Sequence, residues 1–204
     1  MLCILLSLTC LRSCGNKSVI MRNLFLLLLL TVTSSLAQVQ DKDTGVSDLG
    51  AQVPADILAG IVLTLKTASD SGMNMSEPQD LISAQEALQW ISDRQYVIEP
   101  TVEWPSPELV EQRVWSDCKG KSLWLSSRLL RLGYRDVKLL IGKIPNSGSG
   151  HAWVELKFGG VTYIMDGTYR GRYTIIPKDR MTVHRDHKIL YTVMPTGVTN
   201  GYAE

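Results

Sequence analysis

The stretch VWSDCKGKSLW, residues 114–124, contains a cysteine where the pattern of residues predicts the start of a helix. Only the thiolate form of cysteine is a nucleophile, and the free N–H groups and dipole of a helix N-terminus favour that negative charge. The neighbouring cations Lys119 and Lys121 act in the same direction. Cys118 is therefore a candidate nucleophile.

A thiol nucleophile also needs a base, and the chain has three histidines, at positions 151, 184 and 187. His151 is the best placed, because it begins a predicted strand directly after the Gly/Ser-containing loop of residues 145–150. His151 is therefore the candidate for proton transfer.

Asp166 is the candidate partner of this imidazole. The Gly-Gly pair at 159–160 predicts a two-residue hairpin loop, which pairs Trp153 with Asp166. His151 precedes Trp153 by two residues, so it falls on the same sheet face as Asp166, with backbones about 7–8 Å apart. A carboxylate there would orient the ring as the third member of a triad. A three-residue loop would instead place the two side chains on opposite faces.

Each of these residues also has an ordinary structural explanation. A single cysteine is most often a small buried apolar residue, and in an oxidising compartment it can link two chains as a dimer. A histidine at a strand start is commonly an exposed polar residue, and Asp-Gly after a strand is commonly a turn. Together, one cysteine, one histidine and one aspartate in this predicted arrangement favour a catalytic site.

The elements that must position these residues change in kind along the chain. Helical spacing of apolar residues predicts helices over 54–68, over 77–95 with Ser76 as N-cap, and from near Cys118 to Gly133. Helices first and strands second predict an α+β domain with an antiparallel sheet. An extended segment is predicted at 96–107, and strands at 137–144, 151–158, 161–166, 172–177 and 187–195.

Three motifs in this order, SDCKGKSLWLSSRLLRLGY, GHAWVEL and YIMDGTY, resemble the core of the transglutaminase-like superfamily. The upstream YVIEPTVEWPSPELVEQ is similar to the lead-in of bacterial transglutaminase-like cysteine peptidases. The resemblance covers residues 96–169. It implies a papain/transglutaminase-like fold, with N-terminal helices and a catalytic helix packed on an antiparallel sheet, and a triad of Cys118, His151 and Asp166.

The resemblance also implies roles for these residues. Cys118 would attack an amide or ester carbonyl, His151 would act as base and then as acid, and Asp166 would orient His151. The backbone N–H of Cys118 would be one donor to the oxyanion. An upstream aromatic or polar side chain often supplies the second donor in the family, and Trp104 is the first candidate here, followed by Trp115.

Some relatives bind calcium through acidic residues that flank the catalytic cysteine. Asp117 would fit such a site but Lys119 would not, because Ca²⁺ requires several oxygen ligands. The expectation is therefore no metal and no other cofactor, with Asp117 as the helix cap.

Residues 1–37 are expected to be an export signal cleaved near Ala37, in which a basic start at Met21-Arg22-Asn23 precedes a short apolar run. Whether translation starts at Met1 or Met21 stays open. Residues 38–50 are expected to be a flexible leader and 51–204 a single domain. Without the signal, Cys118 is the sole cysteine, and no stable membrane span is expected.

The charges after the signal are unevenly distributed. Residues 38–117 carry 4 basic and 14 acidic side chains, and residues 118–204 carry 14 basic and 6 acidic ones. The favoured interpretation is two parts that complement each other, and the alternative is a basic face that attracts acidic ligands. No nucleic-acid motif is present, so no nucleic-acid partner is expected.

The expected function is an exported thiol hydrolase, in the periplasm or outside the cell, acting as a peptidase or amidase. Its partner would be a protein or peptide substrate, or an amide of the cell envelope. Two alternatives stay open: an inactive transglutaminase-like binding module, and a transamidase or deamidase that uses the same triad. The N-terminal helices would complete the core or cover the cleft.

Overall fold

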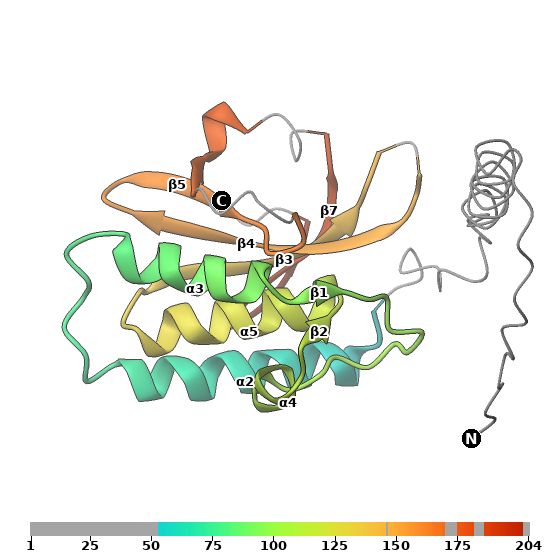
Figure 1. Ribbon diagram of the computed structural model, residues 1–204, viewed down its shortest axis with the longest axis horizontal. Coiled ribbons are helices and arrows are strands. Elements are labelled where there is room, and N and C mark those ends of the chain that lie inside the picture. The colour runs from blue at the N-terminus through green and yellow to red at the C-terminus, as the bar shows by residue number, and fades with distance from the viewer. Residues whose placement is uncertain (1–52, 146, 170–174, 182–185, 202–204) are drawn as a thin grey trace, which may run out of the picture. The chain divides into compact units, whose positions relative to one another are not determined.

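The computed structural model describes residues 53–145, 147–169, 175–181 and 186–201 (Figure 1). The expected signal and leader, residues 1–50, lie outside these ranges, and so does His184. The described residues all belong to one unit, Gly45–Glu204.

Within the described residues, four α-helices precede the main sheet. The first buries Ile61, Leu65 and Ala68 at helical spacing, and the second buries Leu88 and Ile91 in the same way. No helix in this part of the chain is both long and apolar enough to cross a membrane. The helices are α2 (Ala55–Gly72), α3 (Ile82–Ser92), α4 (Pro107–Gln112) and α5 (Cys118–Arg131).

The second helix begins later than predicted. Its first residue is Ile82, so the predicted start at residue 77 and the N-cap at Ser76 are wrong. Asp80 Oδ1 accepts the Ile82 N–H at 2.9 Å. Such a local side-chain bond competes with helix formation for the backbone N–H groups, which explains the late start.

The short helix α4 lies at the end of the segment that was predicted to be extended. Ser106 is its N-cap, with Oγ accepting the Leu109 N–H at 3.3 Å, and Pro107 is its first residue. Serine followed by proline is a helix-start signal. The prediction of an extended segment at 96–107 depended on three prolines close together.

The main sheet of the described chain has six strands in the order β6-β5-β4-β3-β7-β8, and each neighbouring pair is antiparallel. The predicted α+β class is thereby confirmed. The last strand was not predicted. The strands are β3 (Asp136–Lys143), β4 (Gly150–Phe158), β5 (Val161–Met165), β6 (Ile176–Pro177), β7 (Lys188–Met194) and β8 (Gly197–Asn200).

Two short strands form a separate parallel pair, β1 (Gln95–Tyr96) and β2 (Trp115–Ser116). This pair lies at the N-terminal end of α5 (Figure 1). It therefore joins the segment after α3 to the residues that lead directly into Cys118.

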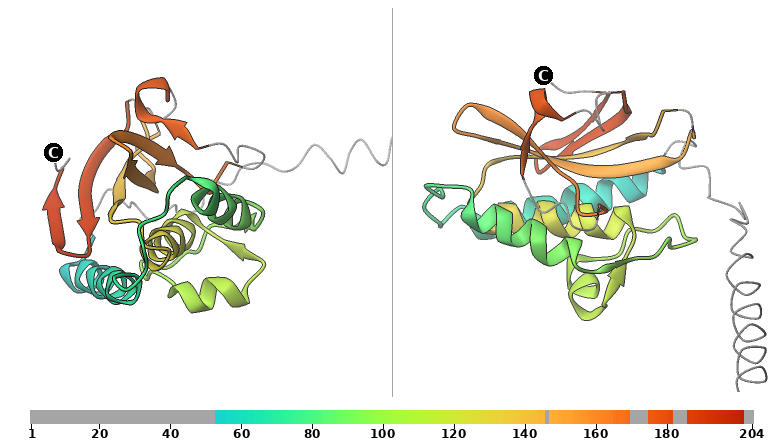
Figure 2. Two further views of the ribbon diagram at one scale, coloured as in Figure 1. Left: turned by 90° about the vertical axis from the view of Figure 1, so that its left-hand side faces the viewer. Right: turned by 45° about the horizontal axis from the view of Figure 1, so that its top comes forward.

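The helices lie on one side of the six-stranded sheet (Figures 1 and 2). α5 contacts β3 and β4, and α2 contacts β7 and β8. Leu139 and Val154 belong to the main core with the helices, whereas Leu140 and Trp153 belong to a second apolar cluster. Because side chains alternate along a strand, the central strands contribute to a core on each face.

Candidate active site

Cys118 is the first residue of α5, and the local sequence explains why the helix begins there. Asp117 is the N-cap, with Oδ1 accepting the Gly120 N–H at 3.0 Å. A side chain at Gly120 would not fit, because a Cβ there would lie 2.2 Å from Ser116 Oγ. The free thiol of Cys118 is buried, at 5% exposure, in the first turn of the helix.

His151 and Asp166 come together across the β4–β5 hairpin. The register pairs Val154 with Met165, as the two-residue Gly-Gly loop requires. His151 Nε2 lies 2.6 Å from Asp166 Oδ2, and both side chains are buried. The hairpin thus joins the two residues that the sequence had placed on one face.

The second oxygen of Asp166 is also held. Oδ1 accepts the Thr168 N–H at 2.9 Å and the Thr168 hydroxyl at 2.6 Å. The carboxylate is therefore fixed in orientation as well as in position, which suits a group that must orient an imidazole.

The surroundings of His151 favour its protonated form. Burial by itself lowers the pKa of His151, but hydrogen bonds to Asp166 and Cys118, together with the negative charges of both groups, raise it to about 10. Because Asp166 holds Nε2, Nδ1 is the ring nitrogen left for the sulfur. This arrangement can hold an imidazolium between a carboxylate and a thiolate.

Tyr96 in β1 lies beside Cys118, and it was not among the site residues predicted from the sequence. Burial raises the pKa of its phenol, and so do the negative charge of Cys118 and a hydrogen bond to it. Tyr96 is nevertheless 40% exposed, so it is in contact with solvent as well as with Cys118. Its only sequence signal was its place at the start of the YVIEP segment that resembles the family lead-in.

The two tryptophans expected near the oxyanion lie in different surroundings. Trp104 lines a hollow of about 300 Å³ beside α2, and its Nε1 has no hydrogen-bond partner among the described residues. The Trp115 ring lies beneath the Arg113 guanidinium, whose carbon is 4.7 Å from the ring centroid. Their role as oxyanion donors stays a prediction.

The residues around Asp117 do not fit a calcium site. Lys119 Nζ lies 2.5 Å from Asp117 Oδ2, and both residues of this ion pair are buried. The same Nζ also donates to Glu99 O at 3.3 Å. Both Asp117 oxygens are therefore engaged, one by the helix N-terminus and one by an ammonium. Across the described ranges, no group of three or more histidine, cysteine, aspartate or glutamate residues could hold a metal.

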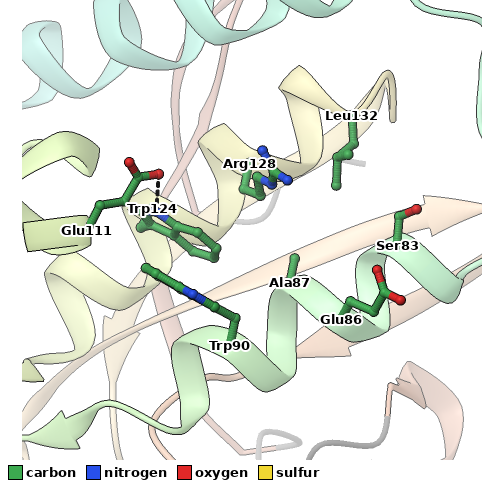
Figure 3. Close-up of a pocket in the computed structure, with 8 residues that line it drawn as sticks. All are labelled: Ser83, Glu86, Ala87, Trp90, Glu111, Trp124, Arg128 and Leu132. Atoms are coloured by element: carbon green, nitrogen blue, oxygen red, sulfur yellow. Dashed lines mark hydrogen bonds between the residues drawn. The ribbon is translucent and has the colours of Figure 1, made fainter. Parts of the chain in front are cut away.

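A groove of about 360 Å³ lies between α3, α4 and α5 (Figure 3). Trp90 and Trp124 stack in it with ring centroids 4.2 Å apart, and Trp124 Nε1 donates to Glu111 Oε1 at 3.0 Å. None of the candidate triad residues lines this groove. The stacked tryptophans hold α3 against α5, and the hydrogen bond from Trp124 to Glu111 holds α4 against α5.

No family model and no curated protein matches this chain. Among solved structures, calcium-bound LapG of Legionella pneumophila matches with a TM-score of 0.51 and 14% identity, covering 68% of this chain and 78% of LapG. EGTA-treated LapG gives 0.51 and 14%, covering 67% and 74%. A proposed cysteine protease from Cytophaga hutchinsonii gives 0.39 and 16%, covering 74% and 55%, which is too weak a likeness to carry an argument.

The likeness to LapG concerns the fold. The shared fold is papain/transglutaminase-like, so the fold expected from the sequence motifs is confirmed. At 14% identity, the likeness carries over no activity or residue role.

Proposed function

From this papain/transglutaminase-like fold, we propose that the chain is a thiol hydrolase, a peptidase or amidase acting on amide bonds of proteins or of the cell envelope. Cys118 is the nucleophile, His151 the proton donor and acceptor, and Asp166 the orienting group. The proposal is carried by the surroundings of the His151 imidazole. Its Nε2 lies 2.6 Å from Asp166 Oδ2, and both Asp166 and Cys118 raise the pKa of the ring.

In the first half of the reaction, the Cys118 thiolate attacks the carbonyl carbon of the substrate. A C–S bond forms, and the carbonyl π electrons move onto the oxygen. The His151 imidazolium then transfers its proton to the amide nitrogen, the C–N bond breaks, and the amine leaves. A thioester remains on Cys118.

Water completes the cycle. The neutral His151 ring takes a proton from water while the water oxygen attacks the thioester carbon. The C–S bond then breaks, which releases the carboxylic acid product and restores the thiolate beside the imidazolium. Asp166 holds the ring in one orientation throughout and favours its charged form.

The developing oxyanion needs hydrogen-bond donors. The backbone N–H of Cys118 at the start of α5 is one, and we assign the Tyr96 hydroxyl as a second. A phenol already carries its proton at neutral pH, and the surroundings of Tyr96 raise its pKa further, so the hydroxyl can donate. No metal or other cofactor is assigned to the step, since Lys119 already engages the Asp117 carboxylate.

The site of action is proposed to be outside the cytoplasm. The support is the basic start and short apolar run before Ala37. An unpaired, thiolate-dependent nucleophile is compatible with that compartment if it is shielded from oxidants, and Cys118 is buried.

The test compares residues 38–204 with and without Cys118→Ser on envelope and secreted proteins of the producing cell. Mass spectrometry of newly formed peptide termini should find cleavages that the wild type makes and the variant does not. Ammonia release and incorporation of an added primary amine distinguish deamidation and transamidation from hydrolysis. Identical termini in both samples would refute the hydrolase.

A second candidate, a binding module that keeps the fold without the activity, is favoured by the burial of Cys118. The rate of iodoacetamide labelling decides between the two. A hydrolase should label at Cys118 at pH 7 far faster than a free cysteine thiol, because its thiolate is already formed. A binding module should label slowly, with a rate that rises only as the pH passes about 8.5.

A further inference from the structure

Lys121 lies one turn after Cys118 on α5, and its side chain is 1% exposed. Lysine is almost never fully buried unless its charge is satisfied, because an ammonium removed from water loses strong hydration. The burial of this particular side chain therefore calls for a specific role.

The ammonium joins two segments that are far apart in the sequence. Lys121 Nζ donates to Arg94 O at 2.6 Å and to Gly167 O at 3.0 Å. Arg94 comes directly before β1, which carries Tyr96, and Gly167 directly follows Asp166. Lys121, on the helix that begins with Cys118, thus contacts the segment that carries Tyr96 and the turn that follows Asp166.

The Gly167 end of this contact is closely packed. A Cβ at Gly167 would lie 2.9 Å from Ile91 Cγ2 and 3.8 Å from Lys121 Cβ. The turn after Asp166 therefore rests directly on α3 and α5, and only glycine leaves space for that approach. A shift of this turn would move the Asp166 carboxylate with it.

The Arg94 end is also immobilised. The Arg94 guanidinium stacks on the Trp90 ring, 3.1 Å from its centroid. Trp90 in turn stacks on Trp124 of α5, as Figure 3 shows. Arg94 Nε also donates to Val110 O in α4, at 3.4 Å. Arg94, whose carbonyl accepts the Lys121 hydrogen bond, is therefore held by contacts with three helices.

Lys119 provides a second buried contact on the same segment. Its Nζ donates to Glu99 O, five residues beyond the carbonyl that Lys121 binds. The segment 94–99 is thus bound to the first turns of α5 at both ends, with Tyr96 between the two contacts.

We propose that Lys121 is a positioning residue, which holds the Tyr96 and Asp166 segments at fixed places relative to Cys118, with Lys119 as a second anchor. An ammonium suits this role, because its three N–H groups can bind carbonyls from different segments at one point. The effect of Lys121 on catalysis rests on the proposed hydrolase. Its contacts do not, since they can be tested without a substrate.

The test is Lys121→Met, which keeps the length of the side chain but removes its donors. Lys157→Met is the matched control, because Lys157 is an exposed lysine of β4. In Lys121→Met, the NMR titration midpoint of His151 should fall by at least one pH unit. Iodoacetamide labelling of Cys118 at pH 7 should slow at least tenfold, and Lys157→Met should match the wild type in both.

A merely structural lysine would behave differently. Its loss would lower the melting temperature, but the folded variant would keep the wild-type His151 titration, and that result would overturn the proposal. If Lys121→Met does not fold, the wild-type ammonium is observed directly by ¹⁵N NMR. Its protons should exchange slowly and show cross-peaks to Arg94 and Gly167, and rapid exchange without these cross-peaks would refute the role.

The outcomes for Lys121 and for the hydrolase are separable. Cleavage that depends on Cys118, with an unchanged His151 titration in Lys121→Met, would leave the hydrolase and remove the positioning role. A changed titration with no cleavage of any protein would do the reverse.

Discussion

At the scale of single residues, the Asp166 carboxylate has both oxygens committed. Oδ2 contacts His151, and Oδ1 accepts two hydrogen bonds from Thr168. The imidazole that it orients is raised in pKa by Asp166 and by Cys118, against the effect of burial. The protonation state of the site is therefore decided by a few side-chain contacts.

Asp166→Asn should keep the shape of this residue and remove its charge. The pKa of His151 should fall from about 10 toward its ordinary value, and the alkaline limb of the pH–rate profile should move to lower pH with it. Hydrolysis at neutral pH should fall about 10²–10⁴-fold, the typical contribution of acid–base catalysis. NMR titration and pH–rate profiles measure both effects.

The control for this change is Asp136→Asn, an exposed aspartate of β3. It should leave the His151 titration and the rate unchanged. A folded Asp166→Asn protein that titrates His151 like the wild type would contradict the orienting role.

Tyr96→Phe should remove the proposed second oxyanion donor and keep the ring. Because such a donor acts on the transition state, kcat should fall about 10²–10³-fold with little change in KM. Tyr163→Phe, at a half-buried tyrosine of β5, is the matched control. An equal loss in both variants, or a change in KM alone, would argue against the assignment and return attention to Trp104.

At the scale of elements, the first turn of α5 combines a helix cap with a buried ion pair. Asp117 supplies one oxygen to the Gly120 N–H and the other to Lys119. A buried ion pair is weak support for stability as a whole, but the loss of one member leaves an unpaired charge in the interior.

Asp117→Ala should therefore cost more than the loss of an ordinary cap. We expect a fall of about 3–5 kcal/mol in the free energy of unfolding, because the Lys119 ammonium stays buried without its carboxylate. Ser106→Ala removes the exposed cap of α4 and should cost about 1 kcal/mol. Urea denaturation compares the two, and equal losses would show that the ion pair contributes nothing beyond capping.

At the scale of the whole molecule, the raised pKa of His151 links the stability of the fold to pH. The ordinary value of 6.5 applies to the unfolded chain, and the folded value is about 10. Below 6.5 both states bind the proton, so its stabilising contribution is fully present. As the pH rises toward 10 the unfolded state loses the proton first, and the contribution disappears.

This linkage predicts how the wild type compares with His151→Gln. The advantage of the wild type in unfolding free energy should be largest below pH 6.5 and should shrink steadily between 6.5 and about 10. Urea titrations at pH 6 and pH 9.5 measure it, and the comparison cancels the titration of other groups. An advantage that grows with pH would show that the folded protein holds this histidine neutral.

Most of the short-range features of the structure were predictable from the sequence, but not all. The start of α5 at Cys118 was predictable because its cap is adjacent in the chain, and the partnership of His151 with Asp166 was predictable because a two-residue turn sets the register. The start of α3 was not, since the side chain of Asp80 competes locally for the backbone.

By itself, the sequence determined the class of fold, the place of Cys118 at a helix start, and the hairpin that joins the His151 imidazole to the Asp166 carboxylate. The tertiary structure alone decided that Tyr96 contacts Cys118 and that Lys119 and Lys121 are buried. These contacts join residues about 20 to 50 positions apart, through the packing of α5 and the parallel pairing of β1 with β2. No local period or turn signal encodes such distances, because they exist only once the separate elements have packed together.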